Sequence, residues 1–217
     1  DGGIEQTSDS DSESVESKGM SPWQKHNASL IDFRLGFVRR SVQGLLYSRE
    51  TQHNWIMVRR RRNEVTLGTR DGQSGEETIQ SRLNIQRPLH LSSPYTKAML
   101  LPLFGRPAPK KILAVGLGGG RLQMFLHHMY PHVEIHTVEI DPVVYQVSVR
   151  FFGFSRDSDR QHVFFSDARD FLRECQADIK YDVILLDAYQ AGGAPLHLLS
   201  YEFYRDNENA WDRVGEA

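Results

Sequence analysis

Residues 111–141 read KILAVGLGGGRLQMFLHHMYPHVEIHTVEID, and four features follow one another along them. An apolar run at 112–115 has the aliphatic and β-branched composition of a strand that is buried on both faces. A glycine-rich turn comes next, followed by a helical segment at 121–129 and a second apolar run that ends in Glu139. This order predicts a β-α-β unit of the kind that binds a nucleotide where the first strand meets the helix.

The glycine-rich turn and the end of the second strand supply the candidate binding residues. Glycine has no Cβ, so the backbone can turn sharply and approach a ligand closely, and the free N–H groups of the next helix point at the same place. The Glu139 carboxylate, 23 positions after Gly116, can accept hydrogen bonds from both hydroxyls of a ribose. The cofactor-binding residues predicted here are Gly116, Leu117, Gly118, Gly120, Glu139 and Ile140.

The spacing of the glycines favours one nucleotide class. The dinucleotide fingerprint G-x-G-x-x-G requires glycine at position 121, where this chain has Arg121. The pattern present is G-x-G-x-G, which suits S-adenosylmethionine (SAM), a cofactor without a pyrophosphate. A dinucleotide site, and a glycine-rich loop that binds nothing, remain as alternatives.

Two more acids follow predicted strands. Residues 162–165 form a third predicted strand, which is followed by Asp167 and Ala168, and residues 181–186 form a fourth, which ends in Asp187. Asp167 can accept a hydrogen bond from an adenine amino group, or cap a helix at 168–174, and the two roles are compatible. Ligands of open α/β sheets bind at the carboxyl ends of the strands, so we expect Asp167, Ala168 and Asp187 to join the cofactor site.

Six segments together resemble one protein family. They are VGLGGG (115–120), VEIDPVV (138–144), RFFGFSRDSDR (150–160), SDARDFL (166–172), YDVILLDAY (181–189) and PLHLLSYEFY (195–204). The chain resembles the spermidine synthase-like branch of the class I SAM-dependent methyltransferase superfamily. Residues 47–74 resemble the small β-hairpin domain that precedes the core in spermidine synthases, and residues 93–103 resemble the helix that joins the two. The glycine turn also resembles that of a eukaryotic methyltransferase acting on an elongation factor.

The resemblance implies an α/β fold class, a Rossmann-like class I methyltransferase fold with a parallel sheet, preceded by the small β-hairpin domain. We expect a disordered acidic, Ser-rich tail at 1–30, the small N-terminal β domain at 31–92 and the SAM-binding core at 93–217. One helix, at about 198–211, is predicted after the fourth strand, so the last three strands of the family's seven have no sequence here. We expect the fourth strand to form an apolar sheet edge, and favour a piece of a longer enzyme over coverage by a partner.

Two departures bear on the reaction. Spermidine synthases carry an aspartate in the glycine turn and two aspartates after the fourth strand, where this chain has Gly119, Asp187 and Gln190. A dicationic polyamine needs anionic partners, so we favour a SAM-dependent methyltransferase with a small-molecule or protein acceptor. An aminopropyltransferase of polyamine biosynthesis, which uses decarboxylated SAM, and a non-catalytic SAM-fold module remain alternatives.

The catalytic candidates lie at the end of the fourth strand. Methyl transfer needs an aligned acceptor and, for a protonated amine or a hydroxyl, a general base. Asp187 is the predicted base, and Tyr189 and His197 are predicted to form the wall of the site or a proton relay.

Composition excludes several classes of protein. A single cysteine and the absence of any long apolar run favour a cytoplasmic protein that is not in a membrane, while a homodimer remains open. Eight arginines lie between positions 34 and 62; a hairpin tip at 59–63 is favoured over a nucleic-acid site. No metal site is expected, because His127, His128, His132 and His136 lack tetrahedral spacing and a completing acid or cysteine.

Overall fold

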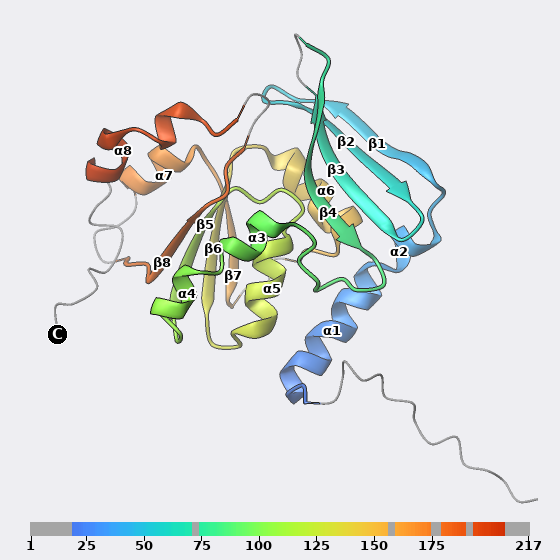
Figure 1. Ribbon diagram of the computed structural model, residues 1–217, viewed down its shortest axis with the longest axis horizontal. Coiled ribbons are helices and arrows are strands. Elements are labelled where there is room, and N and C mark those ends of the chain that lie inside the picture. The colour runs from blue at the N-terminus through green and yellow to red at the C-terminus, as the bar shows by residue number, and fades with distance from the viewer. Residues whose placement is uncertain (1–18, 71–73, 156–158, 175–178, 190–192, 207–217) are drawn as a thin grey trace, which may run out of the picture.

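The computed structural model describes residues 19–70, 74–155, 159–174, 179–189 and 193–206. It contains an antiparallel sheet in the N-terminal half and a parallel sheet in the C-terminal half (Figure 1). This is the α/β architecture that the sequence predicts, although the N-terminal unit is a complete sheet of four strands and not a hairpin. No helix within the described ranges is long and apolar enough to cross a membrane.

The N-terminal sheet is a meander in which each strand pairs with the next. Its strands are β1 (Gly44–Glu50), β2 (Trp55–Arg61), β3 (Glu64–Arg70) and β4 (Glu77–Asn84). The turn between β2 and β3 consists of only two residues, and Arg62 there has a φ of 54°. The predicted hairpin is present, but its exposed tip is shorter than 59–63, because Arg59 and Arg60 belong to β2 and pair with β3.

One face of this sheet is part of a core shared with the C-terminal half. Ile56 and Val58 of β2 and Leu83 of β4 are fully buried, and they belong to the same apolar cluster as Val147 and Phe151. The last two residues lie on helix α6, which contacts β2. The N-terminal sheet is thus held against helix α6 by apolar packing, and Figure 1 shows α6 beside this sheet.

Two helices precede the N-terminal sheet, α1 (Pro22–Arg34) and α2 (Gly36–Arg40). Helix α1 overlaps the predicted 1–30 tail, so the disorder prediction is wrong from about residue 21 onward. Ser21 and Gln24 form a reciprocal capping box with Pro22 as first helical residue, and Ile31 on the buried face joins the core. Residues 1–18 of the predicted tail lie outside the described residues.

The parallel sheet has the strand order β7-β6-β5-β8. Its strands are β5 (Lys111–Val115), β6 (Glu134–Glu139), β7 (Gln161–Phe165) and β8 (Val183–Leu186). The connecting helices are α5 (Arg121–Met129), α6 (Pro142–Phe152) and α7 (Ala168–Glu174), with the bounds that the sequence predicts. Asp141 caps α6 through its side chain, and Gly153 ends that helix with a positive φ of 74°.

Three predictions need correction at the edges of this core. The predicted helix at 93–103 is two short helices, α3 (Pro94–Ala98) and α4 (Pro102–Gly105), since Pro102 begins a new turn. The predicted helix at about 198–211 starts later, as α8 (Tyr201–Asp206), after a 3₁₀ turn at Leu196–Leu198. The fourth strand begins at Val183 and not at position 181.

Strand β8 forms one edge of the described sheet, as the sequence predicts. Among the described strands it pairs with β5 alone, and its side chains alternate between buried and half-buried. The carboxyl ends of β5 to β8 all point toward the N-terminal sheet and α7 in Figure 1.

Candidate functional site

A cavity lies at the carboxyl ends of the parallel strands, where the sequence places the cofactor. It is lined by most of the predicted site residues, namely Gly116, Leu117, Gly118, Glu139, Ile140, Asp167, Ala168, Asp187 and Tyr189. His197 lines it as well, while Gly120 does not. Four strand ends that are separated along the chain therefore meet in one site.

The glycine turn is shaped by close packing. Gly116 has a φ of 95°, and a Cβ there would lie 2.5 Å from the carbonyl oxygen of Asp187. Gly120 has a φ of 66°, and a Cβ there would lie 2.5 Å from the ring of Phe154. Gly120, predicted to contact the cofactor, instead lets the first turn of α5 pack against Phe154. Any larger residue at either position would push the turn out of place.

The Glu139 carboxylate stands at the end of β6 and is held by backbone amides. One oxygen accepts a hydrogen bond from the Leu117 N–H and the other from the Asp141 N–H, each at 2.9 Å. Burial raises the pKa of Glu139, and the two N–H donors counteract this in part. Each carboxylate oxygen still has a lone pair, so the group can accept ribose hydroxyls from the cavity that it lines.

The N-terminal sheet contributes the turn between β1 and β2 to the same cavity. Thr51 donates a hydrogen bond of 2.6 Å from its hydroxyl to Asp141, whose other oxygen caps α6 through the Val143 N–H. His53 and Asn54 then line the cavity. The Asn54 side-chain oxygen is buried and has no hydrogen-bond partner within the described residues, which suits a ligand that brings a donor.

Asp167 caps the helix that follows β7, while its predicted contact with an adenine amino group stays a prediction. One oxygen accepts the Arg169 N–H at 2.8 Å and so caps α7, as the helix-cap interpretation predicts. The other oxygen lies 3.0 Å from Nε2 of His197, which comes from the 3₁₀ turn before α8. The imidazole is thus a neighbour of Asp167, not of Asp187.

Asp187 differs from the other acids of the cavity. Its carboxylate makes no hydrogen bond or ion pair with any described residue, and burial raises its pKa to about 7. Tyr95 of α3 also lines the cavity, and its pKa is raised by burial and by the charge of Asp187. Tyr189 lines the cavity and is 54% exposed, which suits the predicted role in the cavity wall better than a proton relay. Gln190 lies outside the described residues.

A family model of the spermine/spermidine synthase domain matches residues 94–213, which is more than half of the chain. The chain belongs to the spermine/spermidine synthase domain family. The family match covers the whole of the parallel sheet and all four acids of the cavity. The resemblance that the motifs indicate is thereby confirmed.

Relatives of this family domain fall into two functional groups. A polyamine aminopropyltransferase of Vibrio vulnificus is 39% identical over 123 residues, which cover 56% of this chain and 41% of that protein. An eEF1A lysine and N-terminal methyltransferase of Bos taurus is 43% identical over 108 residues, which cover 45% of this chain and 15% of that protein. The chain thus spans less than half the length of these two relatives.

Solved structures agree on the fold. A spermidine synthase in complex with the transition state analogue AdoDATO superposes with a TM-score of 0.59 at 21% identity, over 78% of this chain and 55% of that one. A probable spermidine synthase from Corynebacterium glutamicum gives a TM-score of 0.63 at 16% identity, over 81% and 62%. The predicted Rossmann-like class is therefore confirmed.

Several residues of the cavity escape prediction from sequence. They are His53, Asn54, Thr69, Gln80, Ser81 and Tyr95, all from elements that precede the glycine turn. Ser81 of β4 accepts a hydrogen bond of 2.9 Å from the Gly119 N–H, so the N-terminal sheet completes the turn. The only signal in the sequence was the resemblance of residues 47–74 to a domain that precedes the core, which does not say where that domain packs.

One polar cluster lies at the opposite, amino end of the sheet. Glu134, His136 and His162 bring their ligand atoms within 4.8 Å of one another. The sequence predicts no metal site, for lack of a completing acid or cysteine, and it does not reveal this grouping, because Glu134 and His162 come from neighbouring parallel strands. Lys111 already binds the second Glu134 oxygen at 3.0 Å, and Tyr181 contacts Nδ1 of His136 at 2.8 Å.

Proposed function

We propose that this domain is a SAM-dependent methyltransferase in which Asp187 accepts the proton of a single nucleophilic amine or hydroxyl. One observation carries the proposal: Asp187 is the only carboxylate in the described lining of the cavity that has no partner. The carboxylates of Glu139, Asp141 and Asp167 are held by backbone amides and by neighbouring side chains.

The described residues fit the adenosyl part of SAM. Glu139 faces the cavity with free lone pairs for a ribose diol, Asp167 and Asn54 offer oxygens to a base, and the turn at Gly116 leaves room for close approach. When bound, SAM supplies an electrophilic methyl group on a sulfonium. The relatives named above include a methyltransferase, which supports this choice of cofactor.

The position and pKa of Asp187 suit a general base. A pKa of about 7 means that the carboxylate is partly deprotonated at neutral pH and basic enough to accept a proton from an ammonium acceptor. Its burial in the cavity wall keeps water from solvating the charge. The charge of Asp187 contributes to the raised pKa of Tyr95, so the two side chains are near each other. Tyr95 narrows the cavity on one side and so orients the acceptor.

Aminopropyl transfer to a polyamine precursor is the second candidate, and the relative from Vibrio vulnificus favours it. A dicationic acceptor would meet one unpartnered carboxylate in the described lining, which leaves the second ammonium without a counter-charge. An aspartate at position 119 is also opposed by packing, because a Cβ on Gly119 would lie 2.7 Å from the Phe152 ring and 2.9 Å from Ser81. We therefore rank methyl transfer first.

The decisive experiment identifies the co-product. The protein is incubated with SAM and eEF1A, the acceptor of the Bos taurus relative, and separately with decarboxylated SAM and putrescine. Formation of S-adenosylhomocysteine in the first reaction supports the proposal, whereas methylthioadenosine in the second alone would establish the aminopropyltransferase. Calorimetric titration with both cofactors accompanies the assay, and a protein that binds neither would be a non-catalytic module.

A further inference from the structure

A second cavity of about 160 Å³ adjoins the cofactor cavity. Five residues line both, namely Gln80, Ser81, Tyr95, Leu117 and Asp187. The second cavity extends from there between β4, the segment before α3 and the first residues of α5, where it is lined by Arg121 and Leu122. The function proposed above uses Asp187 and Tyr95 of this shared wall and assigns no role to Arg121 or Leu122.

Arg121 is a buried cation in the wall of this second cavity. Only 7% of the residue is exposed, and its guanidinium contacts the backbone oxygens of Pro88 and His90 and the sulfur of Met124. Its Nε–H has no partner within the described residues, and no described carboxylate pairs with it. Burial lowers the pKa of Arg121 to about 10, so it remains charged at neutral pH.

A buried positive charge without a counter-ion is costly unless a ligand provides the anion. Arg121 is also the first residue of α5, so the partial positive charge of that helix N-terminus adds to its own. The other arginine of this cavity, Arg82, is largely exposed and pairs with Glu64 at 3.0 Å. Arg121 is therefore the charge that a buried anion would meet.

The strand order gives the direction of the ligand. Glu139 and Asp167 follow β6 and β7 on one side of β5, while Asp187 follows β8 on the other side. A cofactor with its ribose at Glu139 crosses the glycine turn after β5, and its far end enters the space bounded by Leu117 and Asp187. In SAM, that far end carries an α-carboxylate, which decarboxylated SAM lacks.

We propose that Arg121 binds the α-carboxylate of SAM in the second cavity and so selects SAM over decarboxylated SAM. This inference rests on the function proposed above and adds the residue that sets its cofactor specificity. It also gives a reason for an arginine at the position where the dinucleotide fingerprint has glycine. The arginine side chain binds the carboxylate end of the ligand, while the glycine turn contacts the central part.

The test is calorimetric titration of wild-type protein and the Arg121→Met variant with SAM, decarboxylated SAM and methylthioadenosine. We expect wild-type protein to bind SAM at least ~10-fold more tightly than decarboxylated SAM, as for loss of one charge-assisted contact. Arg121→Met should weaken SAM binding by about 10–100-fold and leave the other two affinities within about twofold. Arg121→Lys, which keeps the charge but not the planar fork, should recover part of the loss.

Methylthioadenosine controls for the fold, because it has the adenosyl part and no amino-acid end. Arg61→Met, at an exposed position of β2 outside the printed lining of both cavities, is the matched variant, and it should change none of the three affinities. Equal weakening of all three ligands by Arg121→Met would mean that Arg121 only supports the segment at 88–90, and would overturn the inference. Equal wild-type affinities for SAM and decarboxylated SAM would overturn it too, but leave the proposed cofactor site standing. Failure of all three ligands to bind wild-type protein would overturn both.

Discussion

The two ends of the parallel strands, called the carboxyl edge and the amino edge of the sheet, carry acids in different states. At the carboxyl edge, Asp187 is half-buried, has no hydrogen-bond or ion-pair partner among the described residues, and has a pKa that burial raises to about 7. At the amino edge, burial would raise the pKa of Glu134, but hydrogen bonds from Lys111 and His136 outweigh burial and hold that pKa below its usual value. Asp182, at the same edge, accepts the N–H groups of Lys110 and Lys111.

This difference between the acids indicates which edge is suited to bind a ligand. The acids at the amino edge are satisfied by the protein itself, so their charges contribute to the folded state. Asp187 lowers stability in its ionised form, and such a group is retained where a ligand or a proton transfer uses it. Substitutions at the carboxyl edge should therefore affect ligand binding and activity, and those at the amino edge should affect stability alone.

Gly116→Ala should have the broadest effect, since it changes both cofactor affinity and stability. The new methyl group would meet the Asp187 carbonyl, and alanine at a φ of 95° adds roughly 1–2 kcal/mol of backbone strain. We expect affinity for S-adenosylhomocysteine to fall by more than ~100-fold, with a lower melting temperature, by calorimetry and thermal unfolding. Gly105→Ala is the matched control, since a Cβ there meets nothing within 4 Å. Normal affinity in Gly116→Ala would refute the packing described for the turn.

Asp187→Asn should separate activity from stability. We expect turnover to fall by about 10²–10⁴-fold, because the general base is lost, while cofactor affinity is kept. In the wild-type protein the rate should rise as the pH passes through 7. A variant that retained full turnover with its true acceptor would exclude Asp187 as the base.

The same variant should be more stable than the wild type in alkaline solution. The pKa of Asp187 is higher in the folded protein than its usual 3.8, so folded protein binds the proton more tightly and loses stability as the pH rises from about 4 to about 7. Asparagine avoids this loss. We expect a gain on the order of 2–4 kcal/mol at pH 8 and almost none at pH 4, by urea unfolding.

Glu134→Gln should act in the opposite direction. Since the pKa of Glu134 is lowered in the folded protein, its contribution is present at neutral pH and disappears as the pH falls below its usual range. We expect a loss of about 1 kcal/mol or less at pH 7, because the side chain is 35% exposed and partly screened. Affinity for S-adenosylhomocysteine should not change. Glu174→Gln, exposed at the end of α7, is the control; impaired cofactor binding in Glu134→Gln alone would show that the edges are coupled.

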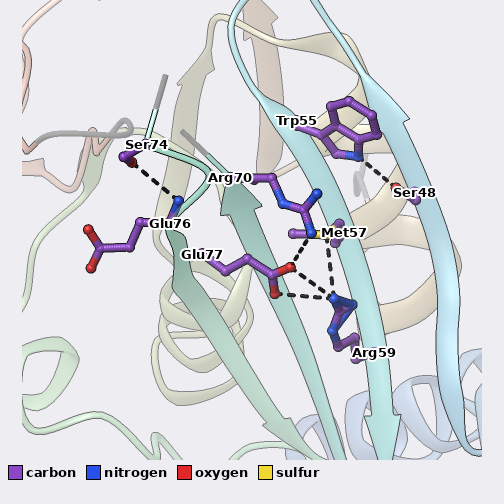
Figure 2. Close-up of polar contacts among 8 residues, drawn as sticks. All are labelled: Ser48, Trp55, Met57, Arg59, Arg70, Ser74, Glu76 and Glu77. Atoms are coloured by element: carbon purple, nitrogen blue, oxygen red, sulfur yellow. Dashed lines mark hydrogen bonds and ion pairs between the residues drawn. The ribbon is translucent and has the colours of Figure 1, made fainter. Parts of the chain in front are cut away.

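Glu77→Gln should have the smallest effect. Figure 2 shows Glu77 of β4 receiving hydrogen bonds from Arg59 and Arg70, while Arg70 lies over the ring of Trp55. These groups are exposed, so we expect the melting temperature to fall by no more than about 2 °C and the difference to vanish in high salt. Glu76→Gln is the control, since that carboxylate points away from the arginines in Figure 2. A fall that persists in high salt would mean that the cluster is more than a surface ion pair.

The sequence predicted the parallel core well because its signals are local. Asp141 and Pro142 mark the start of α6, and the strands of the parallel sheet are short apolar runs. The glycine turn and the acids at three strand ends then followed from the geometry of parallel sheets. All of these features can be recognised within a few residues.

The missed features depend on contacts between distant segments. Helix α1 has few apolar residues and is held by packing of Trp23 and Asn27 against residues of α5, which composition cannot reveal. The pairing of Asp167 with His197 spans 30 positions, and the hydrogen bond from Thr51 to Asp141 spans 90. The unpartnered state of Asp187 could not be predicted either, because it depends on which side chains fail to reach it.

The hydrogen bond between Ser81 and the Gly119 amide has a practical consequence for protein engineering. A shortened protein that began after β4 would lack Ser81, and so would a protein whose N-terminal sheet was replaced by a foreign segment. In both, the Gly119 amide would lose its acceptor and the loop would lose the oxygen that fixes it. The two halves therefore form one unit for cofactor recognition, and experiments that transplant the domain into another protein should exchange them together.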